Sequence, residues 1–208
     1  MSKKQFIIAG IGTDVGKTIA SAIIAQALEA SYWKPIQAGD LESSDSIMVA
    51  SLTNKKVTIL PEQFCLTASM SPHASAELDN IFITEEAFEI PRVKGNLIIE
   101  GAGGIMVPLN NEGLLSIDLF KKWNLPVILI SRHYLGSINH TLLSIEALKA
   151  KKIPIEGIVF IGDENKETES IILKVSALTF IARIPIASEV NALYVRAQVG
   201  MFQEYFQS

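Results

Sequence analysis

The residues best suited to chemistry lie between positions 10 and 18, where Gly-Ile-Gly-Thr-Asp-Val-Gly-Lys-Thr follows a short apolar run. In such a turn the backbone N–H groups point at anionic oxygens, and a helix that begins at its end adds a positive pole. Lys17 has the length and charge to reach terminal phosphates, and the Thr18 hydroxyl is a suitable Mg²⁺ ligand. The segment predicts a phosphate-binding loop that takes a nucleotide.

The glycine spacing of this loop is unusual. Gly10 lies one residue further from Gly16 than the first glycine of the common pattern. A glycine-bearing turn with an exposed lysine is the simpler alternative, but the strand-like run before it and the helical run after it favour nucleotide binding. The extra residue indicates a loop variant outside the commonest enzymes of this type.

Three more charged residues follow or lie near strand-like runs. Glu100 ends an apolar run and precedes Gly101-Ala-Gly-Gly104, which is typical of a Mg²⁺ carboxylate beside a phosphate site, whereas a turn cap is the alternative. Lys34 is suited to neutralising a transferring phosphoryl group, or else is a solvated surface group. Asp45 is either a second Mg²⁺ carboxylate or a helix cap. We expect both Lys17 and Lys34 to be exposed charges outside the core.

Strand-like runs alternate with helical patterns, which predicts one α/β domain over residues 1–208 with a mostly parallel sheet flanked by helices. Segments such as Val127-Ile-Leu-Ile130 are continuously apolar, as expected for strands buried on both faces. The predicted strands are 5–9, 32–36, 96–100, 126–131, 155–161 and 179–183, and the clearest helices are 18–30 and 137–151. Ligands bind at the carboxyl ends of parallel strands, so the motifs above should meet at one sheet edge.

The composition excludes several classes of protein. The 208 residues are 49% hydrophobic and carry a net charge of −4, so no basic field is available to hold a nucleic acid. No apolar stretch approaches the ~20 residues that span a bilayer, so we expect no membrane insertion. The N-terminus lacks a signal-peptide pattern, and the only cysteine, Cys65, cannot form an internal disulfide. We expect a cytoplasmic protein in which Cys65 is a small buried side chain.

Taken in order, these motifs resemble the dethiobiotin synthetases. The segments that carry the resemblance are Gly-x-Gly-Thr-Asp-Val-Gly-Lys-Thr (10–18), Lys-Pro-x-Gln-Ala-Gly (34–39), Ser44-Asp45, Ser-Pro-His (71–73), Glu-Gly-Ala-Gly-Gly (100–104) with Pro108-Leu109, and Leu-Gly-x-Ile-Asn-His (135–140). The match covers nearly the whole chain, less closely toward the C-terminus. It implies a P-loop NTPase-like three-layer sandwich.

The resemblance also implies an activity and a set of cofactors and partners. Members of this family are ATP-dependent cyclo-ligases of biotin biosynthesis, which close the ureido ring of dethiobiotin from 7,8-diaminononanoate and CO₂ with ATP and Mg²⁺. One amine takes up CO₂ as a carbamate, ATP phosphorylates it to a carbamic-phosphoric anhydride, and the second amine closes the ring. ADP and phosphate are released, and the enzymes are homodimers with the substrate near the subunit interface.

The resemblance assigns roles to residues of this chain. Lys17 and Lys34 would be catalytic. Nucleotide would be bound by Gly12, Thr13, Asp14, Val15, Gly16, Lys17, Thr18 and Glu100. Substrate would be bound by Thr13, Lys34, Ala38, Gly103, Gly104, Leu135 and Asn139, the last two reaching into the partner's site. Mg²⁺ would be held by Thr18, Asp45 and Glu100.

Two departures from the family pattern affect specificity. Ala38 stands where many relatives have Ser or Thr, so one hydroxyl toward the substrate is missing. Ile161 stands where relatives often have an Asn for base recognition, and an apolar side chain neither donates nor accepts a hydrogen bond. We therefore expect relaxed discrimination among nucleobases, with Val190, Asn191 and the tail beyond them lining the base pocket.

Two alternative functions share the same nucleotide core. An ATP-dependent amidase of the cobyrinate type usually carries an added glutaminase domain, for which 208 residues leave no room. A partitioning or cell-division switch ATPase typically has a signature lysine early in its phosphate loop, where this chain has Gly12. That class also often uses a basic or amphipathic patch, which an acidic chain does not favour.

Overall fold

The computed structural model describes residues 3–207, and within them the central element is a seven-stranded sheet of order β4-β2-β6-β1-β7-β8-β9. Every neighbouring pair of its strands is parallel. The strands are β1 (Gln5–Gly10), β2 (Ser31–Trp33), β4 (Thr58–Leu60), β6 (Leu97–Gly104), β7 (Val127–Arg132), β8 (Ile155–Ile161) and β9 (Phe180–Ile184). A small parallel sheet pairs β3 (Ile36–Ala38) with β5 (Phe64–Leu66).

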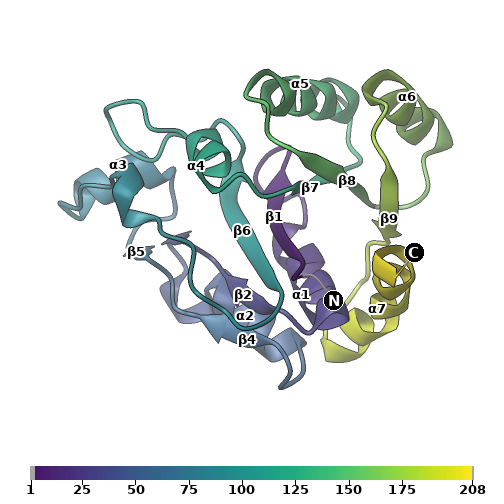
Figure 1. Ribbon diagram of the computed structural model, residues 1–208, viewed down its shortest axis with the longest axis horizontal. Helices are drawn as coiled ribbons and strands as arrows, with labels where there is room; N and C mark the ends of the chain where they lie inside the picture. Colours follow the sequence, from purple (N-terminus) through teal and green to yellow (C-terminus); the bar gives the residue numbers. More distant parts are fainter. Residues whose placement is uncertain (1–2, 208) are drawn as a thin grey trace.

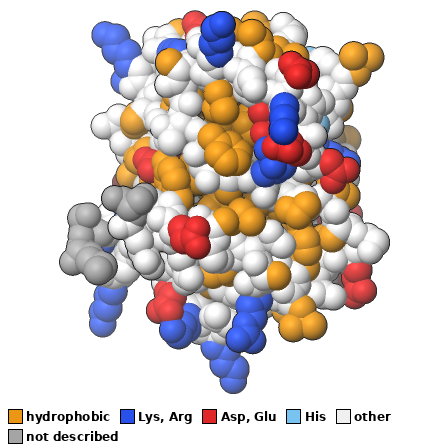
Figure 2. Space-filling view, turned by 90° about the vertical axis from the view of Figure 1, so that its right-hand side faces the viewer, with side chains coloured by type: hydrophobic (Ala, Val, Ile, Leu, Met, Phe, Trp, Pro, Cys, Tyr) orange, Lys and Arg blue, Asp and Glu red, His pale blue; other side chains and the backbone are white. Residues whose placement is uncertain are grey.

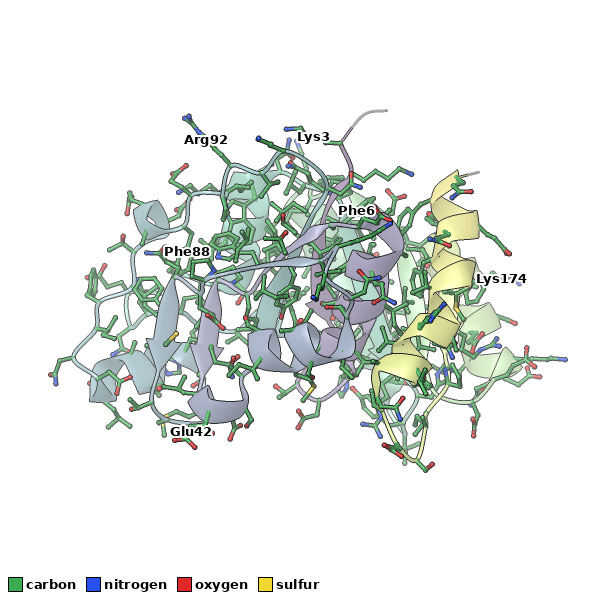
Figure 3. All side chains as sticks on the ribbon, turned by 90° about the horizontal axis from the view of Figure 1, so that it is seen from below. Lys3, Phe6, Glu42, Phe88, Arg92 and Lys174 are labelled. Atoms are coloured by element: carbon green, nitrogen blue, oxygen red, sulfur yellow. The ribbon has the colours of Figure 1, made fainter. Side chains whose placement is uncertain are left out.

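Helices cover both faces of the large sheet (Figure 1). One face is covered by α1 (Lys17–Leu28), α2 (Asp45–Leu52) and α7 (Ala192–Gln207), which lie in front of the sheet in Figure 3. The other face is covered by α4 (Ser116–Trp123), α5 (Ser137–Ala150) and α6 (Lys166–Ser176), while α3 (Pro72–Leu78) packs against the small sheet. The predicted three-layer α/β fold is therefore confirmed.

The apolar strands form because both of their faces are buried. Ile7 and Ile8, consecutive residues of β1, are both fully buried and belong to the cores on opposite sides of the sheet. A strand alternates its side chains between its two faces, so burial on both sides requires a continuous apolar run. The same reason accounts for the predicted strands in β7 and β8.

The structure corrects two predicted strands. The expected strand 32–36 is split into β2 and β3 around Lys34 and Pro35, because proline has no N–H for the sheet and the chain leaves it there. The expected strand 96–100 continues to Gly104. Ile8 pairs with Glu100 but Gly10 pairs with Gly104, so extra residues of β6 bulge beside the phosphate loop.

The surface differs from one expectation. Cys65 is exposed, because it lies in a three-residue strand of the small sheet whose alternate residue faces outward, so the prediction of a buried thiol is wrong. Figure 2 shows the side formed by α6, β9 and α7, where hydrophobic side chains lie among charges of both signs. Among residues 3–207, no helix is long and apolar enough to cross a membrane.

Candidate active site

A cavity of about 790 Å³ opens at the carboxyl ends of β1, β2 and β6. Figure 3 distinguishes the two ends of the strands. Lys3, which precedes β1, lies at one edge of the molecule, and Glu42, two residues after Asp40 of the cavity lining, lies at the opposite edge. The predicted residues that line the cavity are Thr13, Asp14, Gly16, Lys17, Thr18, Lys34, Ala38, Asp45, Glu100 and Gly103. The prediction that these motifs meet at one sheet edge is confirmed.

The phosphate loop turns sharply into α1. Gly16 precedes the helix with φ 92°, a left-handed conformation that glycine adopts without strain. Lys17 then begins α1, and its ammonium donates to the Gly12 carbonyl at 3.0 Å. Lys17 is only 7% exposed, which corrects the expectation of an exposed charge. Burial lowers its pKa below the ordinary value of 10.5.

Two further contacts shape the loop. Asp14 has φ 55°, and its carbonyl accepts a hydrogen bond from Arg132 at the end of β7, 3.0 Å away. Val15 points into the core, so its side chain does not line the cavity. The loop is therefore anchored by the buried side chain of Val15 and by the hydrogen bond from Arg132.

Thr18, Lys34, Asp45 and Glu100 form one cluster at the cavity floor. The Thr18 hydroxyl lies 2.7 Å from Asp45 Oδ1 and 3.0 Å from Glu100 Oε1. The Lys34 ammonium donates to Glu100 Oε1 at 3.0 Å and also pairs with Asp45. A cation between two carboxylates neutralises charge that would otherwise be costly to bury.

Lys34 is 4% exposed and Glu100 is fully buried, so the expectation that Lys34 is an exposed charge is wrong. Burial alone would lower the pKa of Lys34, but the charges of Glu100 and Asp45 outweigh it and raise this pKa above 10.5. Burial would likewise raise the pKa of Asp45, but the Lys34 partner holds it below 3.8. Lys34 and Asp45 are therefore both held in their charged forms.

The position of Asp45 decides between its two predicted roles. Ser44 is the residue that caps α2, because its side chain accepts a hydrogen bond from the Ile47 N–H. Asp45 is the first residue of the helix, and its carboxylate turns to Thr18 and Lys34. The helix-cap alternative does not apply to Asp45.

The glycines after Glu100 lie against the phosphate loop. A methyl group at Gly103 would lie 3.6 Å from Thr13 Oγ1, and one at Gly104 would lie 3.5 Å from Gly12 Cα. The bulge of β6, seen as a shift in its pairing with β1, brings this segment to the loop. Backbone groups of both segments therefore approach the same ligand space.

Comparison with known proteins agrees with this geometry. A family model described as an AAA domain matches residues 4–193. The chain is 49% identical over 202 residues to the ATP-dependent dethiobiotin synthetase BioD of Christiangramia forsetii, covering 97% of each chain. It is 48% identical to the enzyme of the same name from Agrobacterium fabrum, covering 87% of this chain and 85% of that one.

The chain belongs to the dethiobiotin synthetase family. The solved structures that it resembles share its fold. They include a putative plasmid partition protein of Borrelia burgdorferi bound to AMPPNP and the cell division ATPase MinD of Pyrococcus furiosus. Each has a TM-score of 0.58 and 12% identity, and each match covers 99% of both chains. At this identity the likeness concerns the fold alone, so it gives no support to the switch-ATPase alternative.

Several residues at the dethiobiotin synthetase site were missed by the sequence reasoning. Gln37 lines the cavity and bridges two segments, donating to the Gly39 carbonyl and accepting from the Asp45 N–H. Its place in the Lys-Pro-x-Gln motif was the available signal. Ser69 and Met70 also line the cavity, directly before Ser71 and Pro72 of the Ser-Pro-His motif, which line it as well. Tyr32 lies below the cluster, and no motif indicated it.

Two predicted substrate-binding residues lie outside the cavity of the single chain. Leu135 and Asn139 are exposed at the start of α5, and neither lines the cavity. Their predicted contact is with the partner's site, which one chain does not test. Gly12, Val15 and Gly104 also contribute no lining side chain, as expected for residues that would act through their backbone.

Ile161 is the last residue of β8 and packs against the phosphate loop. A methyl group at Gly16 would lie 3.3 Å from Ile161 Cγ1, and Ile161 is 7% exposed. Asn191 caps the start of α7 by accepting from the Leu193 and Tyr194 N–H groups. The predicted effect of Ile161 on base recognition stays a prediction.

The residues of the cluster fit a Mg²⁺ ion bound together with a nucleotide. Thr18, Asp45 and Glu100 supply hard oxygen donors. The Thr18 hydroxyl lies within hydrogen-bond distance of both carboxylates, so the three donors are already close together. Among residues 3–207, no group of three or more His, Cys, Asp and Glu side chains is arranged to hold a metal. This donor set is typical of Mg²⁺ that takes its remaining ligands from phosphates and water.

Proposed function

We propose that this chain closes the ureido ring of dethiobiotin from 7,8-diaminononanoate, CO₂ and ATP, as a single domain over residues 1–208. The observation that carries the proposal is the convergence of Lys17, Thr18, Lys34, Asp45 and Glu100 on one cavity. Relatives at 43–49% identity are named for this activity. The two features are independent, since one is geometry and the other is ancestry.

The reaction needs an oxyanion to meet a γ-phosphate, so the protein contributes position and charge rather than a nucleophile. Backbone N–H groups of residues 12–18 bind the phosphates, and the Lys17 ammonium contacts the terminal phosphate. Lys34 is placed to neutralise the carbamate and the transferring phosphoryl group. Thr13 and Gly103, which are neighbours across the loop, border the substrate end of the cavity.

Thr18, Asp45 and Glu100 are the proposed Mg²⁺ ligands. When bound, Mg²⁺ supplies Lewis-acid neutralisation of the phosphate oxygens. Lys34 pairs with both carboxylates, so it must exchange part of this pairing for the substrate when the site fills. The loss of a buried ion-pair contact is then offset by contacts with the carbamate and phosphate.

The proposal includes a homodimer and a cytoplasmic location. The structural support for the homodimer is a set of apolar side chains at the start of α5: Leu135 is fully exposed, and Tyr134 and Ile138 are 43% and 37% exposed. Such a patch is typical of a surface that a partner covers. Leu135 and Asn139 would then reach the second site, and Ala38 would leave a substrate contact without its hydroxyl.

The direct test is incubation of the purified chain with 7,8-diaminononanoate, ATP, Mg²⁺ and labelled bicarbonate. We expect label in a cyclic urea, together with one ADP per product, and no label when ATP is left out. A Lys17→Gln variant is the matched control. ATP hydrolysis without labelled cyclic urea in the wild type would refute the proposal and favour a switch ATPase.

A further inference from the structure

Tyr32 is a fully buried tyrosine whose hydroxyl meets the catalytic cluster from beneath. It lies in β2 with no exposed surface, and its hydroxyl donates to Glu100 Oε2 at 2.9 Å. The other oxygen, Oε1, accepts from Thr18 and Lys34, each at 3.0 Å. The two oxygens of Glu100 therefore face different partners: Oε1 faces the cavity, and Oε2 faces the protein interior.

The strand register explains this division. Tyr32 pairs with Ile98 on β6, and Ile98 and Glu100 point to the same face of the sheet because they are two residues apart. Tyr32 is thus the diagonal neighbour of Glu100 on the side covered by α1, within reach of a long side chain. Both strands are buried in the sheet, so this contact does not depend on a mobile loop.

A purely structural role for Tyr32 is the simpler alternative. A tyrosine ring fills core space, and a buried hydroxyl needs a partner in any case. The choice of partner goes beyond filling space and satisfying a hydroxyl. Glu100 has no exposed surface, and its Oε2 is held by Tyr32 from the interior, while Oε1 contacts residues that line the cavity. A phenolic hydroxyl is a hydrogen-bond donor, and here it donates to Glu100 Oε2.

We propose that Tyr32 is a positioning residue that fixes Glu100 with a single oxygen toward the metal site and thereby favours Mg²⁺ over Ca²⁺. The inference rests on the proposed function, in which Glu100 is a metal ligand. Mg²⁺ requires near-octahedral geometry with short bonds, which a carboxylate meets with one oxygen. Ca²⁺ takes more ligands at longer distances and often binds both oxygens of a carboxylate. Holding Oε2 in the interior removes the second mode.

The test is Tyr32→Phe, which removes the hydroxyl and keeps the ring. Calorimetric titration with ADP in MgCl₂ or CaCl₂ measures binding without turnover. We expect the affinity for ADP with Mg²⁺ to fall about 10–100-fold, as for other residues that orient metal ligands. The affinity with Ca²⁺ should fall less, so that the Mg²⁺/Ca²⁺ ratio drops on the order of tenfold. An unchanged ratio, with or without a loss of affinity, would overturn the inference.

Tyr205→Phe is the matched control, because the Tyr205 hydroxyl contacts the carboxylate of Glu156 at the other end of the sheet. Its Mg²⁺/Ca²⁺ ratio should equal that of the wild type. If Tyr32→Phe does not fold, infrared difference spectra of the wild type with isotope-labelled glutamate decide the question. A chelating carboxylate band with Ca²⁺ that Glu100→Gln abolishes would overturn the inference, and its absence would support it.

The outcomes separate this inference from the proposed function. A wild type that binds ADP with Mg²⁺ but forms no cyclic urea would refute the proposed reaction and leave the role of Tyr32 testable by the same titrations. A wild type that makes labelled cyclic urea, with an unchanged ion ratio in Tyr32→Phe, would refute only the role of Tyr32.

Discussion

At the scale of single residues, the site depends on buried charges that neutralise one another. Lys34 lies between Asp45 and Glu100, and Lys34 and Glu100 are almost completely removed from solvent. Removing one partner of such a cluster leaves an uncompensated buried charge, which costs more than losing a surface ion pair. Lys17 and Lys34 differ in this respect, because the described contact of Lys17 is with a neutral carbonyl.

Replacing these lysines should therefore separate catalysis from stability. We expect Lys17→Gln and Lys34→Ala each to lower turnover by on the order of 10²–10³, since each removes a charge from the developing phosphoryl oxyanion. Only Lys34→Ala should also lower the free energy of unfolding, by about 3–5 kcal/mol. Turnover of labelled bicarbonate and urea denaturation measure the two effects.

Lys56→Ala is the control for both variants, because Lys56 forms an exposed pair with Glu29 and neither residue lines the cavity. It should leave turnover unchanged and alter stability by less than about 1 kcal/mol. Normal turnover in Lys17→Gln or Lys34→Ala would contradict the assigned roles.

Ile161 gives a prediction about nucleotide choice. Sites that read a polar group by hydrogen bonding discriminate by about 10⁴–10⁵, and Ile161 offers no such bond at this position. We expect kcat/KM for ATP to exceed the values for CTP and GTP by less than about 10². Measuring kcat/KM with all three nucleotides checks this, and an ATP preference in the range of hydrogen-bonding sites would contradict it.

At the scale of elements, strand ends and helix starts position the functional groups. β2 delivers Tyr32 and ends one residue before Lys34, α1 delivers Lys17 and Thr18, and α2 delivers Asp45 at its first residue. Elsewhere on the sheet, one buried carboxylate links α6 to β9 and to the residue that follows β7. Glu169 accepts from Arg183 Nη2 at 2.6 Å and lies 2.9 Å from His133 Nε2.

This tie predicts a pH-dependent stability. Burial alone would raise the pKa of Glu169, but the hydrogen bonds from Arg183 and His133 outweigh it and hold this pKa below 4.5. A carboxyl group with a lowered native pKa contributes stability above its ordinary pKa, and that contribution is lost as the pH falls through the lowered value.

We expect Glu169→Gln to be less stable than the wild type by about 1–3 kcal/mol at neutral pH. The difference should shrink as the pH falls below 4.5, once the wild-type carboxyl group is protonated. Urea denaturation of both proteins from neutral to acid pH measures it. A difference that is constant with pH would show that the charge of Glu169 does not carry the effect.

At the scale of the whole molecule, the phosphate loop, the two carboxylates and Lys34 occupy one sheet edge, while the apolar start of α5 faces outward. Leu135 is fully exposed, and Asn139 is exposed on the following turn. A single chain leaves this surface uncovered, which is why the proposed function includes a second subunit.

Leu135→Asp should shift a dimer toward monomers, because it places a charge where the proposed interface buries an apolar side chain. Sedimentation equilibrium measures the mass, and turnover should fall with dimer content. Leu193→Asp is the control, since Leu193 is also strongly exposed but lies on α7. A monomeric wild type with full turnover would contradict the role of the α5 surface.

The sequence by itself determined the parts of this protein that depend on local pattern. Continuous apolar runs predicted β1, β7 and β8 within a residue or two, because burial on both faces of a strand leaves that mark. The motif at residues 10–18 predicted the phosphate loop, since its glycines and lysine act through local geometry. The three-residue strands β4 and β5 escaped prediction because so short a run carries no period.

Only the tertiary structure decided which charges are buried and what holds them. Nothing local distinguishes Lys34 from a solvated lysine. Its charge can be buried because carboxylates 11 and 66 residues away in the chain accept its hydrogen bonds. The contact of Tyr32 with Glu100 and that of Arg132 with Asp14 likewise join segments far apart in the chain. Local pattern fixes the secondary structure, but burial and charge pairing arise when parallel strands bring distant segments together, because only packing removes water from them.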